Sequence, residues 1–250
     1  MDNTRVALVV LSHNSWSVTE KFLESYLVNT EQDLCHLFWV DNGSTDGTKD
    51  NLIDFINKNS ERLITLDIED TNTGVAGGRN IGIEWFLQSE SGQKCSHLMF
   101  LDNDQFVKRG WLEHHLSILD MGFNLVGVEA WRMNRALFPD RRCVKPSDPF
   151  TYVGGGGMLM EREVAEVVKE FDNAFNPCYF EDPDFCFRTF DAGFKIAWNY
   201  FAKIVHLPHQ TLGKRSDKTD KFMKSMKIFQ SKWKGRQLAN IVQSKISDQK

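Results

Sequence analysis

The N-terminal part of this 250-residue chain alternates short apolar runs with stretches of helical periodicity. The apolar runs are residues 6–11, 37–40, 63–68 and 98–101. The runs at 6–11, 37–40 and 98–101 are uninterrupted, which is typical of strands buried on both faces of a parallel sheet, and 63–68 reads as a further strand. The helical stretches between them follow the order strand, helix, strand, which favours right-handed βαβ units. We therefore predict an α/β fold with a mostly parallel central sheet.

The second half of the sequence is less regular. We expect helices over 111–119 and 183–192, short strands at 125–128, 195–198 and 202–206, and a mobile loop over 132–149. Residues 152–160 read as one strand that contains four consecutive glycines, so its backbone must be approached closely by another part of the molecule. The chain contains neither internal repeats nor low-complexity segments, which favours one compact domain.

The composition excludes several classes of protein. Hydrophobic residues make up 41% of the chain and charged residues 26%, as in ordinary soluble proteins. The apolar runs are too short to cross a membrane, and the N-terminus has no secretory signal pattern. The five cysteines form no C-x-x-C pair, which favours reduced thiols and argues against a zinc site. These features predict a cytoplasmic location.

Charge divides the chain into two parts. Residues 1–209 contain 19 basic and 31 acidic residues, whereas residues 210–250 contain 11 basic and 3 acidic ones. In this tail, apolar residues recur at helical spacing among lysines 218, 221, 224, 227 and 232; they are Phe222, Met226, Phe229 and Trp233. The pattern predicts a basic amphipathic helix.

Three roles for the tail are compatible with this pattern. The helix could contact an anionic membrane at its inner face as a peripheral anchor. It could equally pack on the acidic body, or support homo-oligomerisation through residues 217–243. Binding of nucleic-acid phosphates is a weaker alternative.

Two carboxylates end the apolar run at 98–101. In an extended chain residues i and i+2 point the same way, so Asp102 and Asp104 can converge. Converging carboxylates repel unless a cation lies between them, and a divalent ion that also binds a diphosphate suits this position. Ligands of open α/β sheets bind at the carboxyl ends of strands. The alternative is a β-turn, for which Asp-Asn-Asp is also suitable.

Polar groups follow other predicted strands. Asp41 ends the second strand, where a carboxylate suits the imide N–H of a uracil or thymine; the alternative is a turn that caps the next helix. The loop at 72–80 lacks the spacing of a dinucleotide-binding glycine motif. Its Arg79 would instead support a diphosphate or its base, or would simply be exposed at the start of a helix.

Acids and a histidine complete the set. Glu181, Asp182 and Asp184 precede a predicted helix, which suits its dipole. Three acids exceed what capping requires, and one of them could act as a general base near an incoming hydroxyl. His206 follows a predicted strand; it is either structural or, as a neutral imidazole, the completion of a metal site begun by Asp104.

The order of these motifs resembles the family 2 glycosyltransferases of the GT-A fold, over residues 5 to about 210. The stretch at 152–188 is similar to the branch that acts on rhamnosyl, galactofuranosyl or hexosaminyl donors. The resemblance implies a Rossmann-like sheet flanked by helices in a domain over 1–209, with a nucleotide-binding half (1–104) and an acceptor-binding half (105–209), followed by the basic helical tail (210–250). It also implies inverting transfer of a sugar from a UDP- or dTDP-sugar to a hydroxyl of a glycan or lipid-linked acceptor, in surface polysaccharide synthesis.

The resemblance also assigns roles to residues. The nucleotide-sugar would contact Ser12, Asn14, Asp41, Asn72, Gly74, Arg79, Asp102, Asn103, Gly155 and Gly156. A Mn²⁺ or Mg²⁺ ion would be bound by Asp104 and His206. The family often has His-x-x-Gly at the last motif, whereas this chain has His206-Leu-Pro-His209, so His209 could share or replace that role. Asp182 would be the base, with Glu181 and Asp184 as the next candidates.

Other functions explain the sequence less well. The same chemistry on a nucleic-acid or protein acceptor stays an alternative. A nucleotidyltransferase would need a basic, Gly-rich loop after the first strand, but residues 12–16 contain neither Lys nor Gly. A non-enzymatic sugar-binding module gives no reason for the acids and the histidine to occur together.

Overall fold

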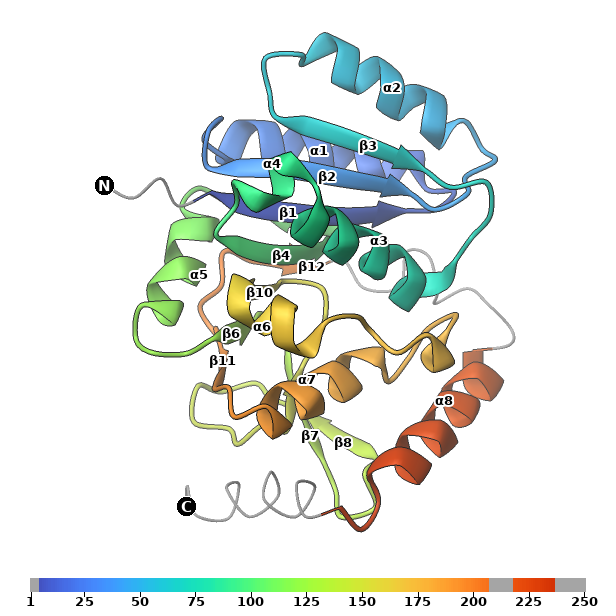
Figure 1. Ribbon diagram of the computed structural model, residues 1–250, viewed down its shortest axis with the longest axis vertical. Helices are drawn as coiled ribbons and strands as arrows, with labels where there is room; N and C mark the ends of the chain where they lie inside the picture. Colours follow the sequence, from blue (N-terminus) through green and yellow to red (C-terminus); the bar gives the residue numbers. More distant parts are fainter. Residues whose placement is uncertain (1–4, 207–217, 237–250) are drawn as a thin grey trace.

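The fold is built on a seven-stranded sheet with the order β11-β6-β10-β4-β1-β2-β3 (Figure 1). The computed structural model describes residues 5–206 and 218–236. The strands are β1 (Val6–Ser12), β2 (Cys35–Asp41), β3 (Ile64–Ile68), β4 (His97–Asp102), β6 (Leu125–Gly127), β10 (Met158–Glu161) and β11 (Ile196–Trp198). Neighbouring strands run parallel except where β10 pairs with β4 and β6. The predicted mostly parallel α/β sheet is confirmed.

Helices cover both faces of this sheet. They are α1 (Trp16–Asn29), α2 (Thr48–Lys58), α3 (Gly74–Gln88), α4 (Glu90–Gln93), α5 (Trp111–Leu119), α6 (Arg162–Val168), a 3₁₀ turn (Asn173–Phe175), α7 (Glu181–Asp191) and α8 (Lys218–Trp233). In β1, Ala7 and Val9 face a core shared with α3, α6, α7 and α8, whereas Leu8 and Val10 face a core shared with α1 and α5. Burial on both faces explains why the apolar runs do not alternate.

Two glycines bring α3 close to the sheet. A Cβ atom at Gly78 would collide with Leu11, and one at Gly82 would collide with Val9. Because these positions are four residues apart, they lie on one face of the helix. The contact places the first turns of α3, including Arg79, beside the carboxyl end of β1.

The structure corrects two predictions for the second half. The predicted loop at 132–149 contains a hairpin of β7 (Ala130–Met133) and β8 (Pro139–Arg142), and β9 (Tyr152–Val153) completes a three-stranded sheet. The predicted strand at 152–160 is divided into β9 and β10. The chain turns between them at residues 154–157, where Gly157 adopts a left-handed φ of 86°. The polar segment forms strands because β7 pairs with both β8 and β9. The predicted strand is interrupted because consecutive glycines readily adopt turn conformations.

A small antiparallel pair lies beside the main sheet. It consists of β5 (Gln105–Val107) and β12 (Ile204–His206), with His206 opposite Gln105. This pairing brings two segments about a hundred positions apart in the sequence to the end of β4. It is the reason that His206 approaches Asp104.

The described part of the tail packs on the body. Phe229 is fully buried and Trp233 is 1% exposed, in the same core as the aromatic residues of α7. The Trp233 indole N–H donates to Asp184 at 2.8 Å, and Lys232 forms ion pairs with Asp172 and Asp184. Of the roles predicted for the tail, packing on the body is the one that residues 218–233 adopt. The boundary at residue 209 stays a prediction, because residues 207–217 lie outside the described chain.

In the described ranges, none of the helices combines the length and the apolar character needed to cross a bilayer. On the predicted amphipathic face of α8, Met226, Phe229 and Trp233 are buried against the body and Phe222 is partly buried.

Candidate active site

A pocket of about 570 Å³ opens at the carboxyl ends of β1 and β4. Twelve of the predicted site residues line it: Ser12, Asn72, Gly74, Arg79, Asp102, Asn103, Asp104, Gly155, Gly156, Glu181, Asp182 and His206. They come from both halves of the domain and meet where open α/β sheets bind their ligands.

Asp102, Asp104 and His206 form a cluster with the composition of a metal site. One donor atom from each lies within 4.8 Å of the others. The Asp104 Oδ1 atom and the His206 Nε2 atom are 3.2 Å apart. Two carboxylates and an imidazole offer hard oxygen ligands and one nitrogen, a donor set that fits a divalent ion such as Mn²⁺. His209 lies outside the described residues.

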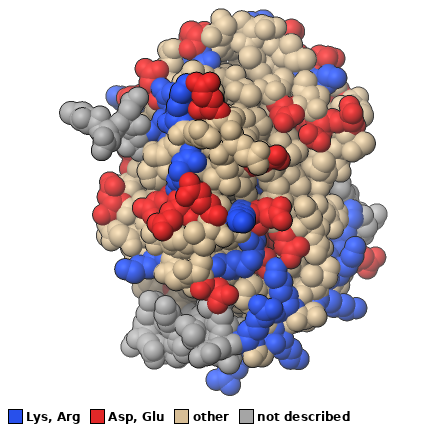
Figure 2. Space-filling model, in the orientation of Figure 1, with Lys and Arg blue, Asp and Glu red and all other residues tan. Residues whose placement is uncertain are grey.

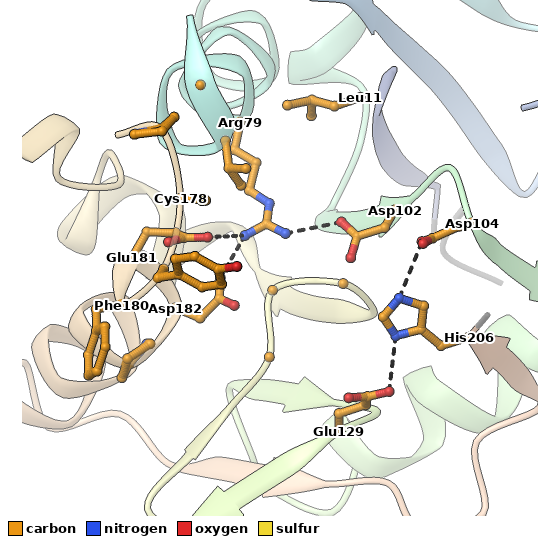
Figure 3. A pocket seen from close by; sticks show the side chains of 18 of the residues that line it. Leu11, Arg79, Asp102, Asp104, Glu129, Cys178, Phe180, Glu181, Asp182 and His206 are labelled. Atoms are coloured by element: carbon orange, nitrogen blue, oxygen red, sulfur yellow. Dashed lines mark hydrogen bonds and ion pairs between the residues drawn. The ribbon is translucent and has the colours of Figure 1, made fainter. Parts of the chain in front are cut away.

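His206 is held between two carboxylates. Its Nε2 side faces Asp104, and its Nδ1 atom lies 3.1 Å from Oε1 of Glu129 (Figure 3). Burial alone would lower the pKa of His206, but the hydrogen bonds with Asp104 and Glu129 outweigh it and raise the pKa to about 10. Glu129 therefore fixes the orientation of the ring, which sequence reasoning did not predict.

Arg79, on α3, connects three carboxylates from two other segments, β4 and α7. Its guanidinium donates to Asp182 Oδ1 at 2.6 Å and to Asp102 Oδ1 at 3.1 Å, and it lies 3.9 Å from Glu181 (Figure 3). The side chain is 5% exposed. Its donors are thus directed at protein carboxylates, whereas the sequence had suggested a diphosphate or a base as its partner. The rigid fork of arginine suits such multiple pairing.

The glycine turn makes room for this network. A Cβ atom at Gly155 would collide with the guanidinium of Arg79 and with Asp182, and one at Gly156 would collide with Asp102. The sequence predicted a close approach to this backbone. The approaching groups are the side chains of the site itself.

The two neighbouring acids on α7 differ in environment. Asp182 lines the pocket with 24% of its side chain exposed, while Glu181 is buried. Burial, reinforced by the charge of Asp182 and opposed by Arg79, raises the pKa of Glu181 to about 8. Within the residues that the structure describes, its Oε2 atom has no hydrogen-bond partner. Burial therefore favours the protonated form of Glu181, which disfavours it as a general base.

Burial also raises the pKa of Asp102, although Arg79 acts in the opposite direction. A second cation nearby would therefore further stabilise the charged form of the Asp102 carboxylate. The geometry places it with the metal cluster as well as on the wall of the pocket, whereas the sequence had assigned it to the ribose or sugar.

Four predicted site residues have other surroundings. Asp41 is fully buried and accepts hydrogen bonds from Ser12 Oγ and the Ser44 backbone N–H, and it does not line the pocket. Asn14 is exposed and accepts from the Thr45 backbone N–H. Asn103 reaches the pocket, but its amide donates to Ser15 and Thr19 of the α1 region at 2.8 Å. Asp184 is fully buried among Arg188, Lys232 and Trp233, so it is not available as a base.

The loop before α3 is shaped by asparagines. Asn72 accepts from the Gly74 N–H at 2.8 Å, and Asn42 donates to the Gly74 carbonyl at 3.0 Å. Asn42 also accepts from Thr73. These bonds fix the loop at the pocket wall and leave Gly74 in a left-handed conformation, with a φ of 81°.

The opposite wall was not predicted from the sequence. It is formed by the β7–β8 hairpin, by residues before α7 and by the start of α8, and its members include Trp131, Pro139, Arg142, Tyr152, Tyr179, Lys218 and Phe222. The only signal that could have found these residues was the grouping of aromatic and basic side chains in 131–142 and 218–222.

The sequence matches the glycosyl transferase family 2 over residues 7–175. Since the match covers more than half of the chain, the protein belongs to this family. A comparison with curated proteins finds no match. The predicted branch within the family is not settled by these comparisons.

Solved glycosyltransferase structures share the fold. GalNAc-T7 with UDP, GalNAc and Mn²⁺ superposes with a TM-score of 0.69 at 14% identity, over 82% of this chain and 44% of that one. The mannosyltransferase PcManGT from Pyrobaculum calidifontis, with GDP-Man and Mn²⁺, has a TM-score of 0.64 at 16% identity, over 82% and 57%. TarS 1–349 from S. aureus with UDP-GlcNAc has a TM-score of 0.59 at 15% identity, over 79% and 56%. The chain thus spans about half the length of these structures.

Proposed function

We propose that this protein is an inverting, metal-dependent glycosyltransferase that moves a sugar from a nucleoside-diphosphate sugar, of the UDP or dTDP type, to an acceptor hydroxyl. One observation carries the proposal. In a chain of glycosyl transferase family 2, a metal-type cluster (Asp102, Asp104, His206) and a pocket-exposed carboxylate (Asp182) meet in one pocket at the carboxyl ends of β1 and β4.

The donor is expected on the side of β1, β4 and α3. Structures with the same fold contain UDP, UDP-GlcNAc or GDP-Man. Ser12, Asn72 and Gly74 line this side of the pocket, and Asp41 supports it from below through the hydroxyl of Ser12. Asp41 would therefore influence binding of the nucleobase indirectly, because it positions the hydroxyl of Ser12.

Asp104 and His206 would hold a Mn²⁺ or Mg²⁺ ion, with Asp102 as a third ligand. When bound, the ion neutralises the negative charge that develops on the leaving diphosphate. Glu129 orients His206 for this role through the bond to Nδ1.

Asp182 is the proposed general base. It accepts the proton of the acceptor hydroxyl while the acceptor oxygen bonds to the anomeric carbon and the bond from that carbon to the diphosphate oxygen breaks. Arg79 binds Oδ1 of Asp182 at 2.6 Å and so holds the carboxylate at the pocket wall. A single displacement of this kind inverts the anomeric configuration.

The acceptor is proposed to be a glycan or a lipid-linked glycan, with surface polysaccharide synthesis as the process. A protein or nucleic-acid acceptor is the alternative. The family match argues against a nucleotidyltransferase, which would release pyrophosphate from a nucleoside triphosphate.

A thermal-shift screen of UDP-, dTDP- and GDP-sugars with Mn²⁺ tests the donor assignment. A donor that binds the native state raises the melting temperature by mass action. We expect stabilisation by one nucleotide class, loss of that shift in EDTA and in Asp104→Asn, and release of nucleoside diphosphate on turnover. Release of pyrophosphate from a triphosphate, or a shift that is insensitive to EDTA, would contradict the proposal.

A further inference from the structure

We propose that the wall opposite the donor is an anion-binding acceptor subsite, so that the acceptor is a glycan bearing phosphate or carboxylate groups. This inference rests on the proposed function. Its central residues are Lys218 at the start of α8 and Arg142 at the end of β8, and both line the pocket.

The start of α8 is a fixed part of this wall. The Phe222 ring contacts the rings of Tyr179, Phe180 and Phe138, with centroid distances of 5.6, 5.2 and 5.9 Å. The Gln230 side chain donates to the Ala136 carbonyl at 2.7 Å, so the helix is also bonded to the tip of the hairpin. Because both ends of this contact are held, Lys218 and Arg142 belong to one structural unit.

This unit carries a strong positive charge. Residues 132–145 contain five basic residues and one acidic residue, and residues 218–236 contain seven and one. Figure 2 shows Lys and Arg side chains gathered over α8. The donor side of the same pocket is lined by carboxylates. The pocket thus has acids on β4 and α7, where a metal and a diphosphate would be bound, and cations on β8 and α8, of which Arg142 also reaches the metal side through its ion pair with Glu129.

Arg142 and Lys218, unlike Arg79, have donors that are not all directed at described carboxylates. Arg142 contacts Glu129 at 3.0 Å through one nitrogen, and 54% of its side chain is exposed. Lys218 forms no ion pair with any residue in the described ranges, in contrast to Lys232, which is bound to Asp172 and Asp184. A guanidinium and an ammonium beside a partly enclosed space bind phosphate or carboxylate through charge-assisted hydrogen bonds.

The aromatic side chains between the cations favour a sugar polymer over a membrane surface. Trp131, Tyr179 and Phe222 line the pocket together with these cations, and aromatic side chains are the apolar groups that ligand pockets use to contact a ligand's apolar surface. A membrane-bound helix would instead present its apolar face to lipid, and α8 buries Phe229 and Trp233 against the body. The cations therefore serve a ligand that enters the pocket.

Matched oligosaccharides test the proposal directly. The probes are a fluorescent oligogalacturonate with its neutral methyl ester, and a phosphorylated dextran oligomer with its unmodified form, each titrated at fixed UDP and Mg²⁺. We expect the full-length protein to bind the anionic member of at least one pair about tenfold more tightly than its neutral mate. Lys218→Gln and Arg142→Gln should abolish most of this preference, and Lys218→Arg should keep it.

Lys227→Gln is the control, because Lys227 is an exposed α8 lysine outside the pocket. Equal affinities within both pairs would overturn the proposal. So would a preference that Lys227→Gln reduces as much as Lys218→Gln, because the effect would then come from diffuse surface charge. Binding to phosphatidylglycerol vesicles that depends on Lys227, with no preference for the anionic glycans, would assign the charge to a membrane instead. Failure of the donor screen would refute the proposed function without changing these glycan affinities.

Discussion

The two walls of the pocket are built in different ways. The wall on which the donor is proposed to bind, here the donor wall, uses residues at or just after strand ends: Ser12 and Asp102 end β1 and β4, and Asp104 follows β4. The opposite wall, on which the acceptor is proposed to bind and which is here called the acceptor wall, joins a hairpin, the residues before α7 and a helix from the C-terminal tail. A parallel sheet delivers the first set by its topology alone, whereas the second set depends on packing between distant segments. The positions of residues on the donor wall thus follow from the strand order, whereas those on the acceptor wall depend on side-chain packing between distant segments.

The largest expected effect distinguishes Asp182 from Glu181 as the general base. Asp182→Asn should lower kcat by about 10²–10⁴-fold, because the base is lost, while the affinity for the donor changes little. Steady-state kinetics with the donor found in the screen, together with donor titration, would measure this. If Asp182→Asn turned over normally and Glu181→Gln did not, the base would be Glu181.

The second prediction concerns the attachment of the acceptor wall. Phe229→Ala should lower the free energy of unfolding by about 3–5 kcal/mol, because a fully buried ring leaves a cavity. Urea denaturation measures the change. Met223→Ala, on the exposed side of α8, is the matched control and should cost far less. A loss below about 1 kcal/mol for Phe229→Ala would show that α8 is not part of the core.

The third prediction sharpens the contrast at the metal cluster. Glu129→Gln should weaken Mn²⁺ binding by about 10–100-fold, because the carboxylate that orients His206 is lost. Titration of Mn²⁺ by electron paramagnetic resonance measures this without turnover. Asp140→Asn on the same hairpin is the control, since Asp140 pairs with Arg132 and lies outside the pocket. An unchanged Mn²⁺ affinity in Glu129→Gln would show that the Glu129 carboxylate is not needed to position His206.

The fourth prediction is a pH dependence of stability, whose effect within any one pH unit is small. The pKa of Glu181 is about 8 in the folded protein, above its value of about 4.3 in an unfolded chain. The folded state therefore binds the proton more tightly, and stability falls as the pH rises from about 4.3 to 8, by at most about 1.4 kcal/mol per pH unit. Glu181→Gln should flatten this fall in the metal-free protein. Urea denaturation at several pH values checks it, and parallel curves for the two proteins would contradict the pKa shift.

Much of the donor side could be predicted from the sequence. Uninterrupted apolar runs located β1, β2 and β4, because strands buried on both faces cannot carry polar side chains. The sequence also placed Asp102 and Asp104 together at a strand end, although the chain is not extended there: Asn103 and Asp104 form the turn between β4 and β5, which was the alternative prediction. The glycine run also indicated a close approach, although the sequence could not say that Arg79 and Asp102 would be the groups that approach.

The remaining features depend on distant pairing. Residues 130–142 lack an apolar run, so their hairpin became visible only through its pairing with β9. Glu129 carries no local signal, because its role arises from the approach of His206 across the β5–β12 pair. Asp184 looked like a third active-site acid, yet it serves Lys232 and Trp233 from a helix whose docking the sequence left open.

Arg79 makes assembly of the active site and completion of the fold a single event. Its buried guanidinium comes from the first half of the chain, and the acids Glu181 and Asp182 come from the second. A molecule in which the halves docked incorrectly would bury this cation without Glu181 and Asp182, leaving Asp102 as its partner from the first half, and such a loss of partners costs several kcal/mol. Molecules that reach the native state therefore already hold the Asp182 carboxylate at the pocket wall. The contact that positions Asp182 is in this way formed during folding, before any substrate is present.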